Sequence, residues 1–334
     1  MMSITRIYKK LIAEGNGILI FSILFAIIIR LVYFLKIGIL EHNAEPSYLW
    51  GIFAPFFTNP YISLAGSSLF VGGIAFLASH INTEHVLIRN KSFLVPSVIL
   101  LMFSCQPSFI SMSAEYVALF LFLSIIGILF ASYQGEHPQS VAFRCSFMLT
   151  LGSLFVPVSL IYLPVLWIAF IIIRSFNIKS LLASISGVII IYFPVFSYYL
   201  FIGNLDAFYL PLQSLIHNMF ELPFAGYNTK NWILLSGVIL LLAVIIGDDY
   251  INRHKDKIKV RSYLSLLLFL TVTSFLLFLF SNTGSYLHLF ITMLCGGFLI
   301  SHFFALVEKV TSVLLFLIVL IFYLFIIFLP FLLL

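Results

Sequence analysis

Glu41 and Glu45 are the acidic residues whose spacing is most suggestive of chemistry. They lie four residues apart, so that on a helix both carboxylates would occupy one face. Two neighbouring carboxylates raise the pKa of one of them, and a raised pKa suits a general acid or base. A solvated pair of loop acids is the alternative interpretation, and the spacing alone leaves both open.

Glu115 and Arg30 are the next two candidates. Glu115 follows Ser113 at the start of an apolar stretch. It is therefore either an acid favoured by a helix N-terminus or a carboxylate at the mouth of an outer cavity. Arg30 lies inside an apolar stretch, where its charge must reach the lipid headgroups by snorkelling or find a partner. Its guanidinium suits two oxygens of a lipid phosphate or of an outer carboxylate.

The remaining polar residues give no complete catalytic or metal motif. His42, His217 and His288 could join the acids around a divalent ion, but their spacing matches no compact ligand pattern. The sequence has no phosphate-binding P-loop, no dinucleotide fingerprint, no zinc-protease motif and no nucleophile elbow. ATP hydrolysis and dinucleotide chemistry by this chain alone are therefore not predicted.

The composition places these residues in a membrane protein. Of 334 residues, 62% are hydrophobic and 9% are charged, and the mean hydropathy is +1.17. Soluble domains are about 45–50% apolar and about 25% charged. So few charges cannot cover a soluble surface, which excludes a cytosolic globular enzyme, and the long unbroken apolar runs exclude an outer-membrane barrel. We predict an all-α, polytopic domain over residues 1–334 with no soluble domain.

About twenty apolar residues cross a bilayer, and on that measure the sequence predicts eleven spans. The fifth and sixth are separated only by residues 156–158, which predicts a tight hairpin or a broken pair. The polar stretch 248–262 is interpreted as a solvated connector, and His302 as a residue packed among phenylalanines. The predicted spans are 17–36, 61–80, 92–107, 114–133, 142–157, 159–174, 181–203, 231–247, 263–281, 286–306 and 310–334.

The distribution of basic residues predicts the orientation. With the N-terminus in the cytoplasm, the segments on that side contain most of the 17 Lys and Arg residues, in accordance with the positive-inside rule. We therefore predict an inner-membrane protein with a cytoplasmic N-terminus and a periplasmic C-terminus. The same residues account for the net charge of +5, so no nucleic-acid partner is predicted.

The opposite, outer face carries the candidate acids and histidines. Its two long loops, 37–60 and 204–230, contain the aromatic residues typical of a membrane interface. Pro46 predicts the first turn of a short amphipathic helix in the first loop, and the second loop can form a similar helix. The polar residues predicted on this face are Glu41, His42, Glu45, Glu115, Asp206, His217, Glu221, Lys230 and His288.

A series of short motifs runs through residues 61–205. They are Gln106-Pro107-Ser108, Ser111-Met112-Ser113-Ala114-Glu115, Tyr162-Leu163-Pro164 and Arg174-Ser175-Phe176-Asn177. Their order resembles that of an uncharacterised family of Bacteroidota integral membrane proteins, which has no activity to carry over. The order is also similar, more weakly, to that of the GT-C glycosyltransferases, whose plan places an acid after the first span and a second acid near a later outer loop. The Asp-Glu pair usual in that family is absent.

The GT-C resemblance implies a GT-C-like order of the first seven spans and transfer of a sugar from a polyprenyl-phosphate donor at the outer face. Glu45 would be the general base, with Glu41 and Glu115 assisting it or holding a divalent ion. Arg30 and Lys230 would hold the lipid phosphate, with Asp206, His217 and His288 as further substrate-binding candidates. These groups predict an outer pocket between the first span, both long loops and the start of the fourth span.

Two alternatives to a transferase remain. The two long loops could cover a pocket or only the end of a packed bundle, and their sequence features would be the same in both cases. In the second case the chain would be a non-catalytic subunit bound to an envelope protein partner, or a carrier. Sparse intramembrane charge argues against a proton-coupled carrier, which needs ionisable relays at mid-bilayer.

Overall fold

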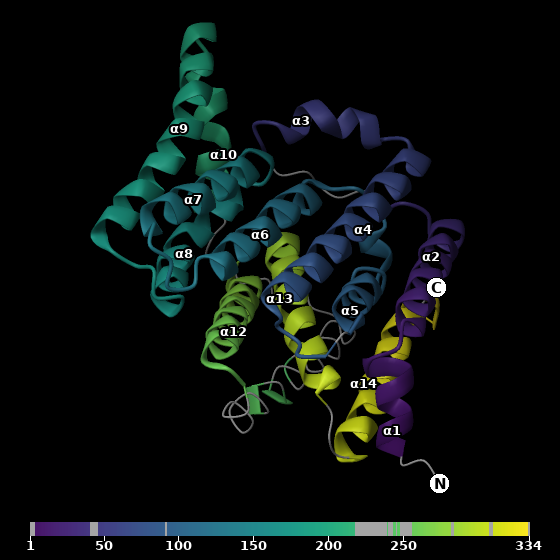
Figure 1. Cartoon of the computed structure of the whole chain (residues 1–334). Coiled ribbons are helices and arrows are strands. Elements are labelled where there is room, and N and C mark those ends of the chain that lie inside the picture. Colours follow the sequence, from purple (N-terminus) through teal and green to yellow (C-terminus); the bar gives the residue numbers. More distant parts are fainter. Residues whose placement is uncertain are drawn as a thin grey trace.

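The described part of the chain in this computed structural model consists of helices (Figure 1). It comprises residues 4–40, 46–90, 92–217, 256–281, 284–306 and 310–332, with residues 239, 243–244 and 246–247. Within it, seven helices are long and apolar enough to cross a membrane, so the protein is a multi-pass helical membrane protein. They are α2 (Gly17–Lys36), α4 (Pro60–His85), α6 (Ala114–Ala131), α9 (Ile178–Ile202), α12 (Ile258–Phe280), α13 (Ser285–Ala305) and α14 (Val310–Leu332).

Shorter elements connect these helices. Three are single turns: η2 (Ala54–Phe57), η3 (Pro107–Phe109) and η4 (Pro157–Ile161) are 3₁₀ helices. The π-helical turn η1 (Lys9–Ala13) joins α1 to α2. The other short helices are α1 (Ile4–Tyr8), α3 (Trp50–Phe53), α5 (Leu94–Met102), α8 (Tyr162–Ile172) and α10 (Leu205–His217). Helix α7 (Pro138–Phe155) has 18 residues, as many as α6, but it is more polar.

The eleven predicted spans are not all confirmed. The prediction for residues 92–107 was wrong, because α5 has 9 residues and is only about 14 Å long. The sixth span is the short apolar run Pro157–Ile172, and the fifth, α7, begins with polar residues. The predicted break between them is present, because α7 ends at Phe155 and η4 follows. The eighth span, 231–247, lies almost wholly outside the described residues.

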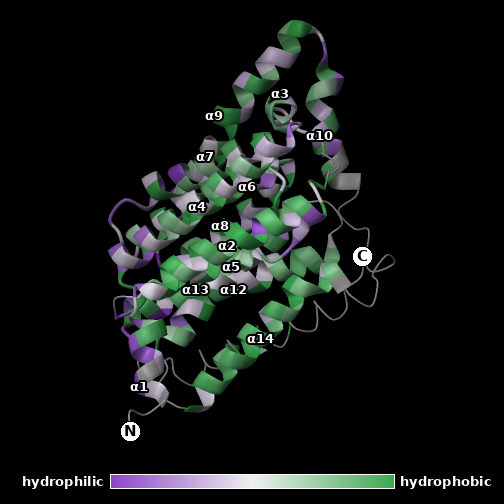
Figure 2. Ribbon diagram, turned by 90° about the vertical axis from the view of Figure 1, so that its right-hand side faces the viewer, coloured by the Kyte–Doolittle hydropathy of each residue, from purple (hydrophilic) through white to green (hydrophobic). Residues whose placement is uncertain are grey.

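Helix α13 lies at the centre of the bundle and α9 at its edge (Figures 1 and 2). Of the spanning part of α13, 89% is buried, against 6% for α9. Small residues allow the close packing of α13, since a Cβ on Gly297 would come within 3.3 Å of Ile99. Its Thr292 hydroxyl is also 2.9 Å from that of Ser274 on α12.

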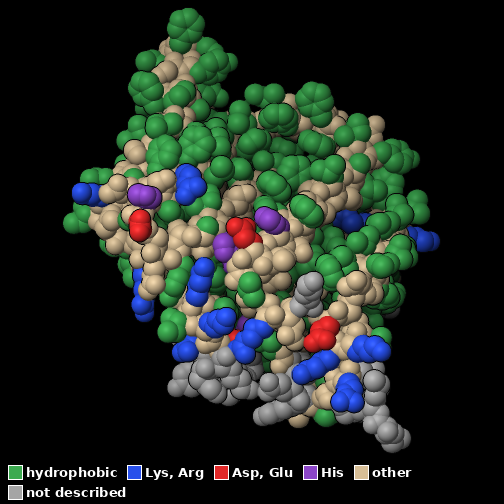
Figure 3. All heavy atoms as spheres, in the orientation of Figure 1, with side chains coloured by type: hydrophobic (Ala, Val, Ile, Leu, Met, Phe, Trp, Pro, Cys, Tyr) green, Lys and Arg blue, Asp and Glu red, His purple; other side chains and the backbone are tan. Residues whose placement is uncertain are grey.

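The surface has two distinct regions. In Figure 3, hydrophobic side chains cover the end of the molecule around α3 and the tip of α9. Lys and Arg side chains gather toward the other end, where α1 and the start of α12 lie. Helices α2 and α14 both begin at this basic end (Figure 1). The bundle therefore has one markedly basic end.

Candidate functional site

The chain leaves helical conformation between α5 and α6, over residues 103–113, with η3 as a single turn inside this segment. Irregular backbone within a membrane bundle must have its polar groups satisfied by protein or by a water-filled cavity. Here tyrosines from two other helices satisfy part of it and of the helix end before it. The Tyr33 hydroxyl lies 3.0 Å from the carbonyl oxygen of Cys105, and Tyr323 donates at 2.7 Å to that of Leu101, in the last turn of α5.

Arg30 contributes to the same task from α2. Its Nη1 donates to the carbonyl oxygen of Phe103 at 3.1 Å. This carbonyl has no intrahelical partner, because α5 ends there. Its Nε and Nη2 donate to the hydroxyls of Ser68 and Ser67 on α4, at 3.0 and 2.5 Å. The guanidinium thus joins α2, α4 and the end of α5.

Helix α4 and Tyr116 hold the second half of the segment. Ser67 Oγ donates to the carbonyl of Ile110, and Ser63 Oγ accepts from the backbone N–H of Met112 at 2.8 Å. The Tyr116 hydroxyl donates to the carbonyl of Phe109 at 2.7 Å. Ser63 and Ser67 were not candidates from the sequence. Their spacing of four on an apolar helix is the signal that could have indicated them.

Arg30 does not snorkel, because its side chain turns inward and the residue is 4% exposed. Snorkelling is therefore the wrong interpretation. The finding has a physical reason, since several oxygens of the protein are within reach and offer the charge better partners than the interface does. Its predicted contact with a lipid phosphate stays a prediction, and such a contact would compete with these three bonds.

Glu115 lies where the sequence places it, in the first turn of α6. It is half-buried and interacts electrostatically with Tyr286, near the start of α13. The Tyr286 hydroxyl forms a hydrogen bond with Ser108, in η3. Glu115 therefore belongs to a small polar group drawn from α6, α13 and η3.

The first long loop, 37–60, packs over its described part onto the ends of several helices. The amphipathic helix predicted to begin at Pro46 does not form there, and the nearest helix is the four-residue, apolar α3, Trp50–Phe53. The reason is that the backbone N–H groups of Tyr48 and Leu49 both donate to the carbonyl of Leu154, at 3.1 and 2.9 Å. This interaction with the end of α7 holds residues 46–49 out of helical conformation.

The second long loop, 204–230, forms α10 over its described part and meets the first loop. The Tyr48 hydroxyl donates to the carbonyl of Phe208 at 2.7 Å, and the two rings lie 5.8 Å apart. Burial raises the pKa of Tyr48, so its hydroxyl stays protonated and remains a donor. The two aromatic loop segments thus form one layer, with Asp206 exposed on α10.

Several predicted site residues cannot be placed. Glu41, Glu45 and Lys230 lie outside the described residues, as does the side chain of His217. Arg30 bonds the start of the 103–113 segment at Phe103, and Glu115 follows its end, while the Glu45–Glu115 separation stays a prediction.

His288 lies inside the bundle rather than at a surface. It is fully buried, and its Nδ1 is 2.8 Å from the hydroxyl of Tyr162. Its Nε2 has no hydrogen-bond partner in the described part of the chain. Among the described residues no group of three or more His, Cys, Asp or Glu could hold a metal ion.

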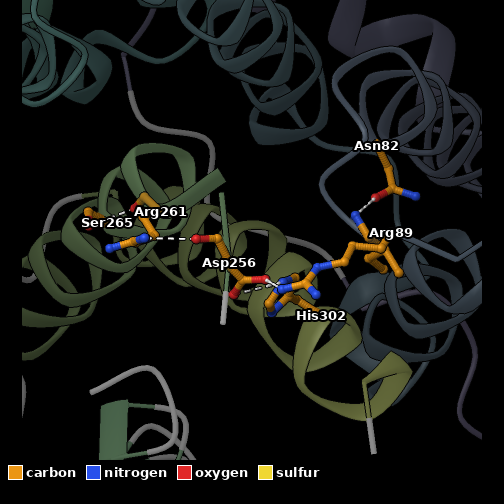
Figure 4. Close-up of polar contacts among 7 residues, drawn as sticks. Asn82, Arg89, Asp256, Arg261, Ser265 and His302 are labelled. Atoms are coloured by element: carbon orange, nitrogen blue, oxygen red, sulfur yellow. Dashed lines mark hydrogen bonds and ion pairs between the residues drawn. The ribbon is translucent and has the colours of Figure 1, made fainter. Parts of the chain in front are cut away.

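A second polar cluster, which the sequence did not indicate, lies at the basic end (Figure 4). The prediction that 248–262 is a solvated connector is wrong for Asp256, which is only 7% exposed. Its carboxylate accepts from Arg89 Nη2 at 2.7 Å and lies 3.7 Å from His302 Nε2. Arg261 Nε donates to its backbone carbonyl at 2.8 Å. His302 therefore faces a carboxylate, although its neighbours in sequence are phenylalanines.

The cluster could not be read from the sequence because its members come from three distant segments. Asn82 orders one of them, since its side-chain oxygen accepts from the N–H of Ile88 at 3.2 Å in the turn that carries Arg89.

Compared with known proteins, the chain matches no protein-family model, no curated protein and no solved structure.

Proposed function

We propose that the protein transfers a sugar from a polyprenyl-phosphate donor at the outer face of the inner membrane, with its N-terminus in the cytoplasm. The observation that supports this proposal is the contact between the two aromatic outer segments at Tyr48 and Phe208. An apolar layer with polar groups at its edge suits a ligand that has a hydrocarbon tail and a charged head.

The aromatic layer extends to the polar group around Glu115. The rings of Trp50 and Phe57 are stacked with centroids 5.7 Å apart. Phe57 lies against Gly66 on α4, where an added Cβ would come within 2.9 Å of its ring and 3.5 Å of Met112. Met112 is three residues before Glu115, so the layer contacts the segment that leads into Glu115.

In this proposal Glu45 is the general base. It takes the proton of an acceptor hydroxyl as the hydroxyl oxygen bonds to the anomeric carbon, and the bond from that carbon to the phosphate oxygen breaks. Glu41 and Glu115 assist it or hold a divalent ion that balances the charge of the leaving phosphate, and Lys230 contacts that phosphate. Arg30 supports the site by fixing the 103–113 segment, on which Ser108 lies.

A non-catalytic subunit of an envelope complex is the second candidate, and α9 is the observation that favours it. Only 6% of its spanning part is buried, and Phe193 and Phe201 are 67% and 93% exposed. Such a helix has ample apolar surface for a partner within the membrane as well as for lipid.

The test replaces the native chain in its host by Glu45→Gln, Glu115→Gln or the control Glu136→Gln. Glu136 is an exposed carboxylate in the connector between α6 and α7. We expect the first two variants to lose envelope glycan and accumulate the polyprenyl-linked sugar, measured by mass spectrometry, while the control matches wild type. Unchanged glycans at normal expression of all three variants would contradict the proposal. A protein that copurifies in equal amount would then favour the subunit.

A further inference from the structure

Basic residues from three separate segments surround the end of α13 at the basic end of the molecule. Asn90, next to Arg89, bonds Glu14 at 3.1 Å through its side-chain amide, which ties this turn to the N-terminal segment. Tyr8 of that segment donates to the carbonyl of Phe304 on α13 at 2.9 Å. The described basic residues gathered in this way are Lys9, Lys10, Arg89, Lys257, Lys259 and Arg261.

Asp256 organises part of this group without neutralising it. Arg89 and Arg261 approach it from two sides, one at its carboxylate and the other at its backbone carbonyl (Figure 4). The Arg89 side chain remains 47% exposed although it is ion-paired. Lys257 and Lys259 are exposed on either side of Ile258. The ion pair therefore fixes a guanidinium at the surface, within a field that stays positive.

Apolar side chains lie within the same surface. Ile258 is 63% exposed between the two lysines, and Val86 is 55% exposed where α4 ends. The Lys259 ammonium lies 5.7 Å from the centre of the Tyr263 ring, one turn further into α12. A basic surface at the ends of two spanning helices, with exposed apolar residues beside it, fits a ligand that carries both a phosphate and an acyl chain.

We propose that this surface binds anionic phospholipids, with Lys257, Lys259 and Arg89 at the headgroup phosphate and Ile258 and Val86 at the acyl chains. Basic residues near an anionic membrane surface are attracted to it, and a fixed guanidinium suits the paired oxygens of a phosphate. A soluble phosphate or a nucleic acid would use the charges but not the apolar residues. The proposal does not depend on the transferase function, because it concerns the opposite end of α4 from Glu115.

The experiment measures the melting temperature of the purified chain in nanodiscs of phosphatidylcholine and in nanodiscs that also contain phosphatidylglycerol. We expect phosphatidylglycerol to raise the melting temperature of wild type, and the Lys257→Gln/Lys259→Gln variant to lose most of this gain. Both lysines are exposed, so the variant is expected to fold. Lys257→Arg/Lys259→Arg keeps the charges and should keep the gain.

The matched control is Lys36→Gln/Lys179→Gln, which removes two exposed basic charges at the ends of α2 and α9. It should respond to phosphatidylglycerol as wild type does. An equal gain in the Lys257→Gln/Lys259→Gln variant would overturn the proposal, and so would an equal loss in the control. A matching gain from inorganic phosphate in phosphatidylcholine nanodiscs would show that the surface recognises phosphate without a lipid, which would overturn the assignment of the ligand.

Discussion

In a soluble protein, water donates hydrogen bonds to the carbonyls that have no intrahelical partner at a helix end. In this bundle the guanidinium of Arg30 is the donor to such a carbonyl. It reaches the carbonyl of Phe103 and two serine hydroxyls, and the described contacts of this side chain include no carboxylate. Burying an unpaired charge is unfavourable, but each hydrogen bond to a charged group contributes about 1.5–3 kcal/mol. At the scale of the residue, Arg30 stabilises the fold only if its hydrogen bonds contribute more free energy than the burial of its charge costs.

We predict that Arg30→Met destabilises the protein by about 2 kcal/mol, because the carbonyl of Phe103 loses its donor. Arg30→Lys should lose less, since an ammonium group can keep one of the three bonds. The measurement is the melting temperature in detergent, with Lys36→Met as the control at the exposed end of the same helix. A melting temperature of Arg30→Met equal to or above wild type would mean that the buried charge costs more than its bonds contribute.

Helix α9 is held to the bundle mainly by α7, against which it packs along much of its length. It begins with a capping box, in which the Asn177 side chain accepts from Ser180 N–H at 2.6 Å and Ser180 Oγ accepts from Asn177 N–H at 3.0 Å. The two helices approach closely at Gly187, where an added Cβ would collide with Ser146 Oγ and come within 3.0 Å of the carbonyl of Phe143. This close approach therefore lies within the contact that holds α9 to the bundle.

Gly187→Ala should therefore separate α9 from α7 and lower the melting temperature by several degrees, because the backbone of α7 cannot give way. Gly72→Ala is the matched control, since an added Cβ there has no atom within 4 Å and the change favours the helix by about 0.5–1 kcal/mol. Equal melting temperatures of the two variants would show that the contact at Gly187 is not tight.

The whole molecule has a basic end and a hydrophobic end (Figure 3), and this asymmetry bears on its orientation in the membrane. The positive-inside rule favours the cytoplasm for the end with Arg89 and the start of α12. Gln139, in the first turn of α7, and Asn204, between α9 and α10, are exposed at opposite ends of these two helices.

We predict that Asn204→Cys reacts with a membrane-impermeant maleimide added to intact cells or spheroplasts, and that Gln139→Cys reacts only after the membrane is permeabilised. The reverse result would assign the opposite orientation. Wild type is the control for background labelling, because its described cysteines are free and Cys145 and Cys295 are buried. Labelling is read by the mass shift of the protein.

The sequence determined the class of the protein and most of its spans. A bilayer offers no hydrogen bonds to the backbone, so an apolar run of sufficient length must become a helix whatever its neighbours are. For this reason the predicted starts at Gly17 and Ala114 are confirmed, and so is the break after Phe155. The position of Glu115 in a first helical turn follows from the same pattern.

Only the tertiary structure decided what the polar side chains do. Where α5 ends, and which carbonyls are then left without partners, depends on the helices packed around that end, so Ser63, Ser67 and Arg30 acquire their roles only in the folded bundle. The burial of Asp256 likewise requires a turn and a helix distant in sequence, those carrying Arg89 and His302. Local pattern sets which segments become helices, while long-range packing sets which hydrogen bonds remain to be made.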